Sequence, residues 1–211
     1  MTAAPHAIGL LEIGSWTASL AAIDAAEKAA PVRLLQVELN DMLGASIKFA
    51  GDTADVAAAL AAGEAIAKSL KATVVAAAIN RPHDQSSALW PLTEEFNPLI
   101  EQTVLHLPRE RDRETNMADS HAPFAIGIIE TQGFTAVIEA IDAACKAANV
   151  EVLGREKLGG GYISVVIKGD VAAVKAAIET GKAHVEGLGK LIAAHVIPRP
   201  SASVLALLPK S

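Results

Sequence analysis

The segment Ala-Ile-Gly-Leu-Leu-Glu at 7–12 returns as Ala-Ile-Gly-Ile-Ile-Glu at 125–130, an offset of 118 residues. The same offset pairs further segments: 23–26 with 141–144, 51–52 with 169–170, and 81–82 with 199–200. Without a gap, 34 of the 85 positions shared by 7–91 and 125–209 are identical. Chance matches would not keep a single offset over that length, so the chain is a tandem duplication.

The duplication predicts two domains joined by a linker. The first domain is expected at 1–91 and the second at 125–211, since the segment 92–124 has no counterpart in either copy. That segment contains three prolines and the mixed charge run 109–114, which is typical of a solvated linker.

Each copy predicts the same order of strands and helices. In the first copy, alanines recur at helical spacing between 17 and 30 and a second helix is expected at 53–70, capped by Asp52 as Asp170 caps its equivalent. The expected strands cover 7–13, 32–39, 45–50 and 73–79, and a short final helix is expected to include Leu89 or, in the second copy, Leu207. The order β-α-β-β-α-β predicts a ferredoxin-like α+β domain in each copy, a four-stranded, mostly antiparallel sheet with helices on one face.

Composition excludes several classes of protein. The 211 residues are 51% hydrophobic but only 3% aromatic, so the chain has enough apolar surface to fold, most of it alanine. No apolar stretch approaches the roughly 18–20 residues of a membrane span, and a net charge of −6 disfavours general nucleic-acid binding. Glu12 interrupts the first apolar segment, so no signal peptide is expected. We expect a cytoplasmic protein that buries apolar surface against other subunits.

Candidate chemical motifs point away from catalysis. The run Gly159-Gly160-Gly161 lies between two predicted strands, where a hairpin turn is expected, and not before a helix as a phosphate loop requires. The six histidines lack metal-ligand spacing and no Gly-x-Ser-x-Gly segment occurs. Cys145 is the single cysteine. We therefore expect no catalytic residues, no metal and no cofactor.

Two charged features are repeated with the domain. Asp24 and Lys28 are four residues apart on a predicted helix, as are Asp142 and Lys146. Arg81 and Arg199 each stand before a proline at the end of the last strand of their copy. The repetition can be interpreted in two ways. The charge pairs are either local helix contacts worth about 0.2–0.5 kcal/mol each or, like the arginines, contacts at subunit edges.

Motifs of the second copy resemble the bacterial microcompartment shell protein domain. They are Ala-Ile-Gly-Ile-Ile-Glu-Thr at 125–131, the helix end at 142–150, Lys-Leu-Gly-Gly-Gly at 157–161, Lys-Gly-Asp-Val-Ala-Ala-Val at 168–174 and Ile-Pro-Arg-Pro at 197–200. The first copy matches more loosely, in the same order. The resemblance covers about 85 residues in each copy and leaves the linker and the termini outside it.

The resemblance implies a tandem-domain shell protein. Members of this kind form homotrimers that look like hexamers and pack edge to edge, together with hexameric and pentameric shell proteins, around encapsulated enzymes in the bacterial cytoplasm. Each copy begins at its own Ala-Ile-Gly strand. The element order is therefore unpermuted, and a single-layer trimer is expected.

The resemblance also implies which residues meet at the edges of such a tile. The family's edge lysine falls on Lys28 and Lys146, each with its aspartate, Asp24 or Asp142, and its edge arginine falls on Arg81 and Arg199. Two residues depart from the family's Pro-Arg-Pro-His motif. Asn80 replaces the first proline in the first copy, and Ser201 replaces the histidine in the second.

The family's central pore is lined by the loop between the second and third strands. Carried over, the pore-lining residues are Asn40, Asp41, Met42, Leu43 and Gly44 in the first copy and Lys157, Leu158, Gly159, Gly160 and Gly161 in the second. A trimer would alternate three loops of each kind around one axis, so we expect a small metabolite pore with a ring of Asp41 carboxylates. Some tandem members carry an iron–sulfur cluster on a pore cysteine; neither loop here contains cysteine, so none is expected.

Two other classes of function remain open on the residues alone. Tandem ferredoxin-like domains often serve as regulatory modules that sense small molecules at their interfaces. An enzyme with its site in a cleft between the copies is a third reading, although no catalytic residue group supports it.

Overall fold

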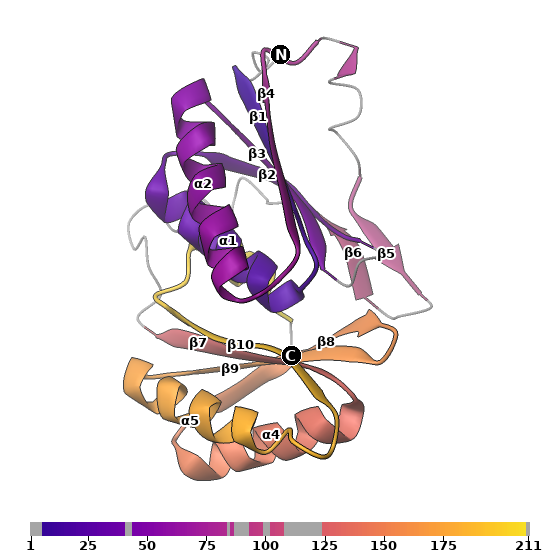
Figure 1. Ribbon diagram of the computed structural model, residues 1–211, viewed down its shortest axis with the longest axis vertical. Coiled ribbons are helices and arrows are strands. Elements are labelled where there is room, and N and C mark those ends of the chain that lie inside the picture. The colour runs from indigo at the N-terminus through magenta and orange to yellow at the C-terminus, as the bar shows by residue number, and fades with distance from the viewer. Residues whose placement is uncertain are drawn as a thin grey trace. The chain divides into compact units, whose positions relative to one another are not determined.

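The computed structural model describes residues 6–40, 44–83, 85–86, 93–98, 102–107 and 124–209. The chain forms two compact units, of residues 1–14 with 18–110 and of residues 15–17 with 111–211. Figure 1 shows one sheet with helices in each half of the chain. The two copies of the repeat therefore fold around separate sheets.

The first copy has the predicted order of elements. These are β1 (Ala7–Ile13), α1 (Trp16–Ala29), β2 (Arg33–Leu39), β3 (Ala45–Gly51), α2 (Thr53–Ser69) and β4 (Val74–Asn80). The strands lie in the order β4-β1-β3-β2, and each neighbouring pair is antiparallel. This is the ferredoxin-like arrangement that the sequence predicts.

The second copy repeats that arrangement. Its elements are β7 (Ala125–Gln132), α4 (Phe134–Ala147), β8 (Glu151–Gly159), β9 (Tyr162–Gly169), α5 (Val171–Ala183), β10 (Lys190–Pro198) and α6 (Ala202–Ala206). Its sheet has the matching order β10-β7-β9-β8, again antiparallel throughout, with α4 and α5 on one face (Figure 1). Leu207 is the C-cap of α6, next to the expected final helix, whereas Leu89 lies outside the described residues.

A hairpin extends the first sheet beyond the predicted four strands. It consists of β5 (Glu95–Asn97) and β6 (Gln102–His106), and β6 pairs with β2 through Val37 and Glu38. The first sheet thus has six strands in the order β4-β1-β3-β2-β6-β5. The segment 92–124, predicted as a linker, therefore contributes secondary structure to the first unit.

A glycine in each opening strand gives the repeated Ala-Ile-Gly motif a role in packing the second helix on the sheet. A Cβ atom on Gly9 would lie 2.9 Å from Val56 Cγ1, and one on Gly127 would lie 2.7 Å from Ile178 Cγ1. Real Cβ atoms essentially never come this close to another heavy atom. The absence of a side chain lets α2 and α5 lie directly on their sheets, which suits thin, alanine-rich domains.

The second helices of the two copies differ in length and in capping. α5 ends at Ala183, and Gly187, with φ of +80°, stands in the turn that follows it. The Asp170 carboxylate accepts a hydrogen bond from the Ala172 N–H at 2.9 Å and caps α5 as predicted. Asp52 occupies the N-cap position of α2 without a side-chain cap bond, because its carboxylate instead lies 3.1 Å from His6 Nδ1.

Candidate functional site

The repeated aspartate–lysine pairs form in both copies. Lys28 Nζ donates to Asp24 Oδ2 at 2.6 Å on α1, and Lys146 Nζ donates to Asp142 Oδ2 on α4. Hydrogen bonding to Asp142 raises the pKa of Lys146 above its usual value, and the nearby Glu139 adds to this. Each pair therefore holds a charged ammonium group near the last turn of the first helix in its copy.

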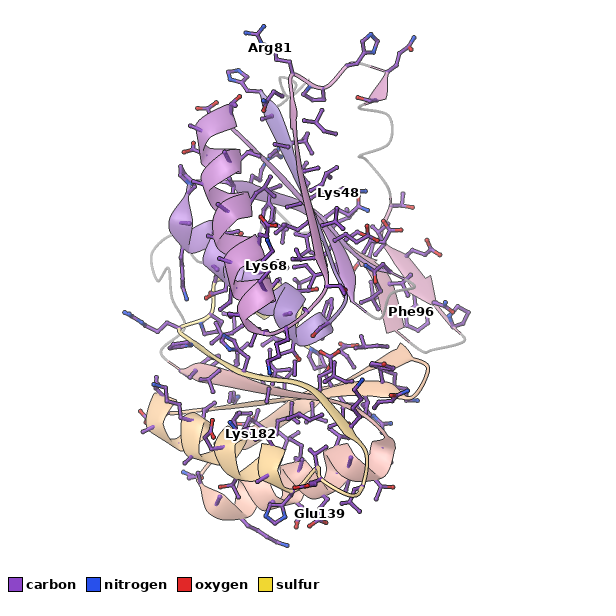
Figure 2. The ribbon with its side chains drawn as sticks, in the orientation of Figure 1. Lys48, Lys68, Arg81, Phe96, Glu139 and Lys182 are labelled. Carbon is purple, nitrogen blue, oxygen red and sulfur yellow. The ribbon has the colours of Figure 1, made fainter. Side chains whose placement is uncertain are left out.

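The repeated arginines share an unusual backbone conformation. Arg81 has a φ of 54° and Arg199 a φ of 52°, although both carry long side chains and both precede proline. The Arg81 N–H donates to the His6 carbonyl oxygen at 2.9 Å, next to the first residue of β1. Figure 2 shows Arg81 at the end of β4. Both side chains are exposed, so each copy presents an arginine in the same left-handed conformation at one end of its sheet.

The glycine-rich loop of the second copy is a tight hairpin turn. Gly159 pairs with Tyr162, and the two residues between them, Gly160 and Gly161, have φ angles of +55° and +82°. Positive φ at both central residues is the requirement of a type I′ turn, so the predicted hairpin is confirmed. The Gly133 N–H donates to the Gly161 carbonyl oxygen at 2.9 Å, which fixes the turn to the junction of β7 and α4.

The matching loop of the first copy is described at its two ends. The Asn40 N–H donates to the Gly44 carbonyl oxygen at 3.0 Å, and the Gly44 N–H donates to Asn40 Oδ1 at 3.0 Å. Asp41, Met42 and Leu43, which the family resemblance implies as pore-lining residues, lie outside the described residues. Two hydrogen bonds between Asn40 and Gly44 therefore join the two ends of the loop.

A row of two glutamates and a serine crosses each sheet at identical positions. Ser46 pairs with Glu12 on one side and Glu38 on the other, and Ser164 pairs in the same way with Glu130 and Glu156. Directly opposed residues in neighbouring strands point to one face of a sheet. The glutamates are repeated in the sequence at the offset of 118 residues, and the register of the strands brings them together with the serine.

The surroundings of the outer glutamate differ between the copies. Lys48 Nζ lies 4.0 Å from Glu38 Oε2, and the Gln36 amide donates to the same oxygen at 3.1 Å. The residues that match Lys48 and Gln36 in the second copy are Val166 and Gly154. Burial raises the pKa of Glu156 to about 7.

Each copy also has a shallow hollow that the sequence did not predict. The hollow of the first copy measures about 470 Å³ and is lined by His6, Pro31, Arg33, Ala50, Gly51, Asp52 and Asp55. The hollow of the second, about 420 Å³, is lined by residues at matching positions, which include Phe124, Glu151, Lys168 and Asp170. There Lys168 Nζ pairs with Glu151 at 3.0 Å and lies 6.0 Å from the centre of the Phe124 ring. The two hollows therefore lie at matching positions, but different side chains line them.

Neither a metal cluster nor a membrane-spanning helix occurs in the described ranges. Across those ranges no three or more histidine, cysteine or acidic side chains are grouped as metal ligands. The described helices are also too short or too polar to cross a bilayer.

Cys145 lies on α4 and is exposed. Partial desolvation of its thiol and the negative charge of Asp142 raise the pKa of that thiol.

A family model matches the chain twice. The BMC domain model covers residues 7–82 and 125–200. These ranges contain the repeated strands and helices, both aspartate–lysine pairs and both arginines, and they leave the β5–β6 hairpin outside.

Curated relatives match either one copy or nearly the whole chain. The bacterial microcompartment shell protein PduA of Citrobacter freundii is 51% identical over 86 residues, which are 41% of this chain and 92% of that protein. The carboxysome assembly protein CcmO of Synechococcus elongatus is 32% identical over 205 residues, 97% of this chain and 69% of that protein. A crystal structure of a microcompartments protein from Desulfitobacterium hafniense DCB is 27% identical, covers 96% of this chain and 99% of its own, and has a TM-score of 0.36.

Proposed function

Because the chain belongs to the BMC domain family, we propose that it is a structural protein of a bacterial microcompartment shell and not an enzyme. The observation that carries this proposal is the double match of the family model, over 7–82 and 125–200. Relatives that match one copy are named as shell proteins, and a relative that matches both is named as a carboxysome assembly protein. The proposed place of the protein is the shell, inside the bacterial cytoplasm.

The assembly proposed for the chain is a homotrimer. Three chains supply six copies of the domain, and a ring of three chains closes without leaving an unpaired surface at either end. Two thin domains in one chain also leave apolar surface that a single core cannot absorb, which favours burial between subunits. The trimer would form a flat tile that packs with other shell proteins around encapsulated enzymes.

Edge contacts between tiles are proposed for Lys28, Lys146, Arg81 and Arg199. Each lysine is held by its own aspartate on the first helix of its copy, and each arginine is exposed at one end of its sheet. Repetition of both features in both copies supports a role that every edge of a tile requires. The aspartates Asp24 and Asp142 position the lysines in this proposal.

A central pore is proposed for the loops at 40–44 and 157–161. The type I′ turn at Gly160 and Gly161 has no side chains, so it presents backbone groups and leaves space around the axis. The first loop brings Asp41, and three such carboxylates would favour small neutral or cationic molecules over anions.

The edge assignment is tested by replacing both lysines with alanine. Purified wild-type protein and the Lys28→Ala/Lys146→Ala variant are compared by negative-stain electron microscopy and by native mass. The wild type should form extended sheets or tubes, whereas the variant should remain trimeric and form neither.

The chain offers a matched control for this experiment. Lys68 and Lys182, both labelled in Figure 2, are also helical lysines, one in each copy. Lys68 pairs with Glu64 at 2.8 Å, and Lys182 pairs with Glu179 at 2.6 Å. The Lys68→Ala/Lys182→Ala variant should assemble like the wild type. Sheets of the Lys28→Ala/Lys146→Ala variant, or loss of sheets in the control, would overturn the edge assignment.

A further inference from the structure

The glycine turn of the second copy is bonded to the junction of β7 and α4. The Gly133 N–H donates to the Gly161 carbonyl oxygen at 2.9 Å, and the buried Thr131 hydroxyl donates to the Gly133 carbonyl oxygen at 3.0 Å. On its other side the junction meets the segment before β10, since a Cβ atom on Gly189 would lie 2.6 Å from the Gln132 carbonyl oxygen. The junction therefore has a fixed position beside the turn.

Two polar side chains flank the turn on one face of the sheet. Gln132 is the last residue of β7 and pairs directly with Tyr162, the first residue of β9. Directly opposed residues of neighbouring strands point to the same face. Tyr162 also pairs with Gly159 at the base of the turn, and a Cβ atom on Gly161 would lie 3.9 Å from Gln132 Cγ. An amide and a phenol thus stand next to a turn that has no side chains of its own.

The first copy has neither of these side chains. At the offset of 118 residues, Gln132 matches Gly14 and Tyr162 matches Gly44. The first copy instead has the sequence Asp-Met-Leu at 41–43, where the second copy has three glycines. One copy therefore has its side chains within the loop sequence, and the other has them on the strand residues that flank the loop.

We propose that Gln132 and Tyr162 line the mouth of the pore beside the glycine turn and contribute to its selectivity. This inference rests on the proposed pore, because it places the turn at the axis of the trimer. Three chains would then bring three amide groups and three phenol groups to the mouth. Both groups are uncharged, and both donate and accept hydrogen bonds. They suit small uncharged molecules that carry hydroxyl or carbonyl groups.

A lysine on the same face supports a preference for uncharged molecules. Lys190 is the first residue of β10 and pairs with Gln132 from the side opposite Tyr162. Its match in the first copy is Ala72. In a trimer, three Lys190 ammonium groups would offset the charge of three Asp41 carboxylates, which leaves hydrogen bonding and size to discriminate between solutes.

Ion selectivity tests the position of Gln132. Wild-type trimers and their variants are compared in planar lipid bilayers under a gradient of potassium chloride. Gln132→Glu should raise the permeability ratio of potassium to chloride by about two- to five-fold, and Gln132→Lys should lower it by a similar factor, because each puts three like charges at the mouth. The matched controls are Gln85→Glu and Gln85→Lys. Gln85 is exposed and follows the end of β4 that lies away from the 40–44 loop, so these controls should leave the ratio unchanged.

Cross-linking gives a readout that does not depend on conduction. In a Cys145→Ser background, Gln132→Cys trimers at low concentration are treated with a three-armed thiol reagent. They should give a covalent trimer, because three copies of the residue surround one axis. Ala172→Cys is the control, since Ala172 is exposed and follows the opposite end of the β7–β9 ladder, and it should give none.

The outcomes separate this inference from the proposed pore. Conducting trimers whose permeability ratio changes with neither Gln132 variant, or changes equally with the Gln85 variants, would overturn the inference and leave the pore intact. Absence of a covalent trimer from Gln132→Cys would also overturn it. A wild-type trimer that conducts no ions would overturn the proposed pore itself.

Discussion

Arg81 and Arg199 have φ angles of 54° and 52°, in the left-handed region that costs a residue with a Cβ atom about 1–2 kcal/mol. The proline that follows each arginine restricts the backbone further. Within the described residues, the only other non-glycine residue with positive φ is Lys71. The same strained conformation at the same position of both copies indicates that the direction of the arginine side chain matters more than local stability.

Replacement of Arg81 separates the backbone from the side chain. Both Arg81→Ala and Arg81→Gly remove the guanidinium group, but only glycine adopts the left-handed conformation without strain. The free energy of unfolding, measured by urea denaturation, should be about 1 kcal/mol higher for the glycine variant than for the alanine variant. Equal stabilities, or a more stable alanine variant, would contradict the strain.

The paired glutamates at position 38 and position 156 show how one residue acquires two environments. Glu38 Oε2 lies 4.0 Å from the ammonium group of Lys48, whereas in the second copy Val166 stands at the position that matches Lys48, so Glu156 lacks this ion pair. Burial raises the pKa of Glu156 from the ordinary 4.5 to about 7, so the folded protein binds that proton more tightly than the unfolded chain. The resulting stabilisation is complete below about pH 4.5 and is lost as the pH rises to about 7.

Glu156→Gln should therefore flatten this part of the stability profile. The variant stays uncharged, so its midpoint of thermal unfolding should match that of the wild type at pH 4.5 and exceed it at pH 8. The control is Glu38→Gln, which loses its ion pair with Lys48 and should gain no stability at pH 8. A constant difference between Glu156→Gln and wild type at both pH values would show that Glu156 does not titrate in this range.

The helices and strands within the repeat were predictable because the two copies show the same sequence pattern at equivalent positions. The opening strand is marked in both copies by a glycine, Gly9 or Gly127, and the start of the second helix by an aspartate, Asp52 or Asp170. The order of the strands in the sheet follows from the β-α-β-β-α-β pattern. The β5–β6 hairpin has no second copy and its strands are only three and five residues long, so hydrophobic periodicity could not identify it. The left-handed arginines also escaped prediction, because arginine carries no local preference for positive φ.

The contact between the two helices of each copy depends on a glycine whose surroundings differ. A Cβ atom on Gly181 would lie 2.7 Å from the Ala140 carbonyl oxygen in α4, whereas one on Gly63 would first meet the flexible end of Leu11, also at 2.7 Å, and lies 3.3 Å from the Ala22 carbonyl oxygen. A backbone carbonyl cannot move aside as a leucine methyl can.

Gly181→Ala should therefore lower the free energy of unfolding by about 1–3 kcal/mol, despite the better helix propensity of alanine. Gly63→Ala is the matched change in the first copy and should be close to neutral, because Leu11 can adopt another rotamer. Both variants are compared with wild type by urea denaturation. The prediction fails if Gly63→Ala is the more damaging of the two.

At the scale of the molecule, the duplication lets one domain keep its geometry while its surfaces diverge. The two hollows lie at matching positions, yet His6 and Asp55 in the first correspond to Phe124 and Ala173 in the second. The second strands differ in the same way: β2 pairs with β6, whereas β8 is the last strand of its sheet among the described residues. This chain therefore has two different surfaces at matching positions, which is consistent with the proposed tile having two kinds of edge.

The most direct test of the shell role is the assembly state of the purified wild-type protein. Native mass spectrometry and negative-stain electron microscopy of one preparation report the oligomer and its packing together. We predict particles with three times the 21.8 kDa mass of the chain, which associate into flat sheets or tubes with hexagonal order. A stable monomer or dimer that forms no ordered sheet at high concentration would contradict the account.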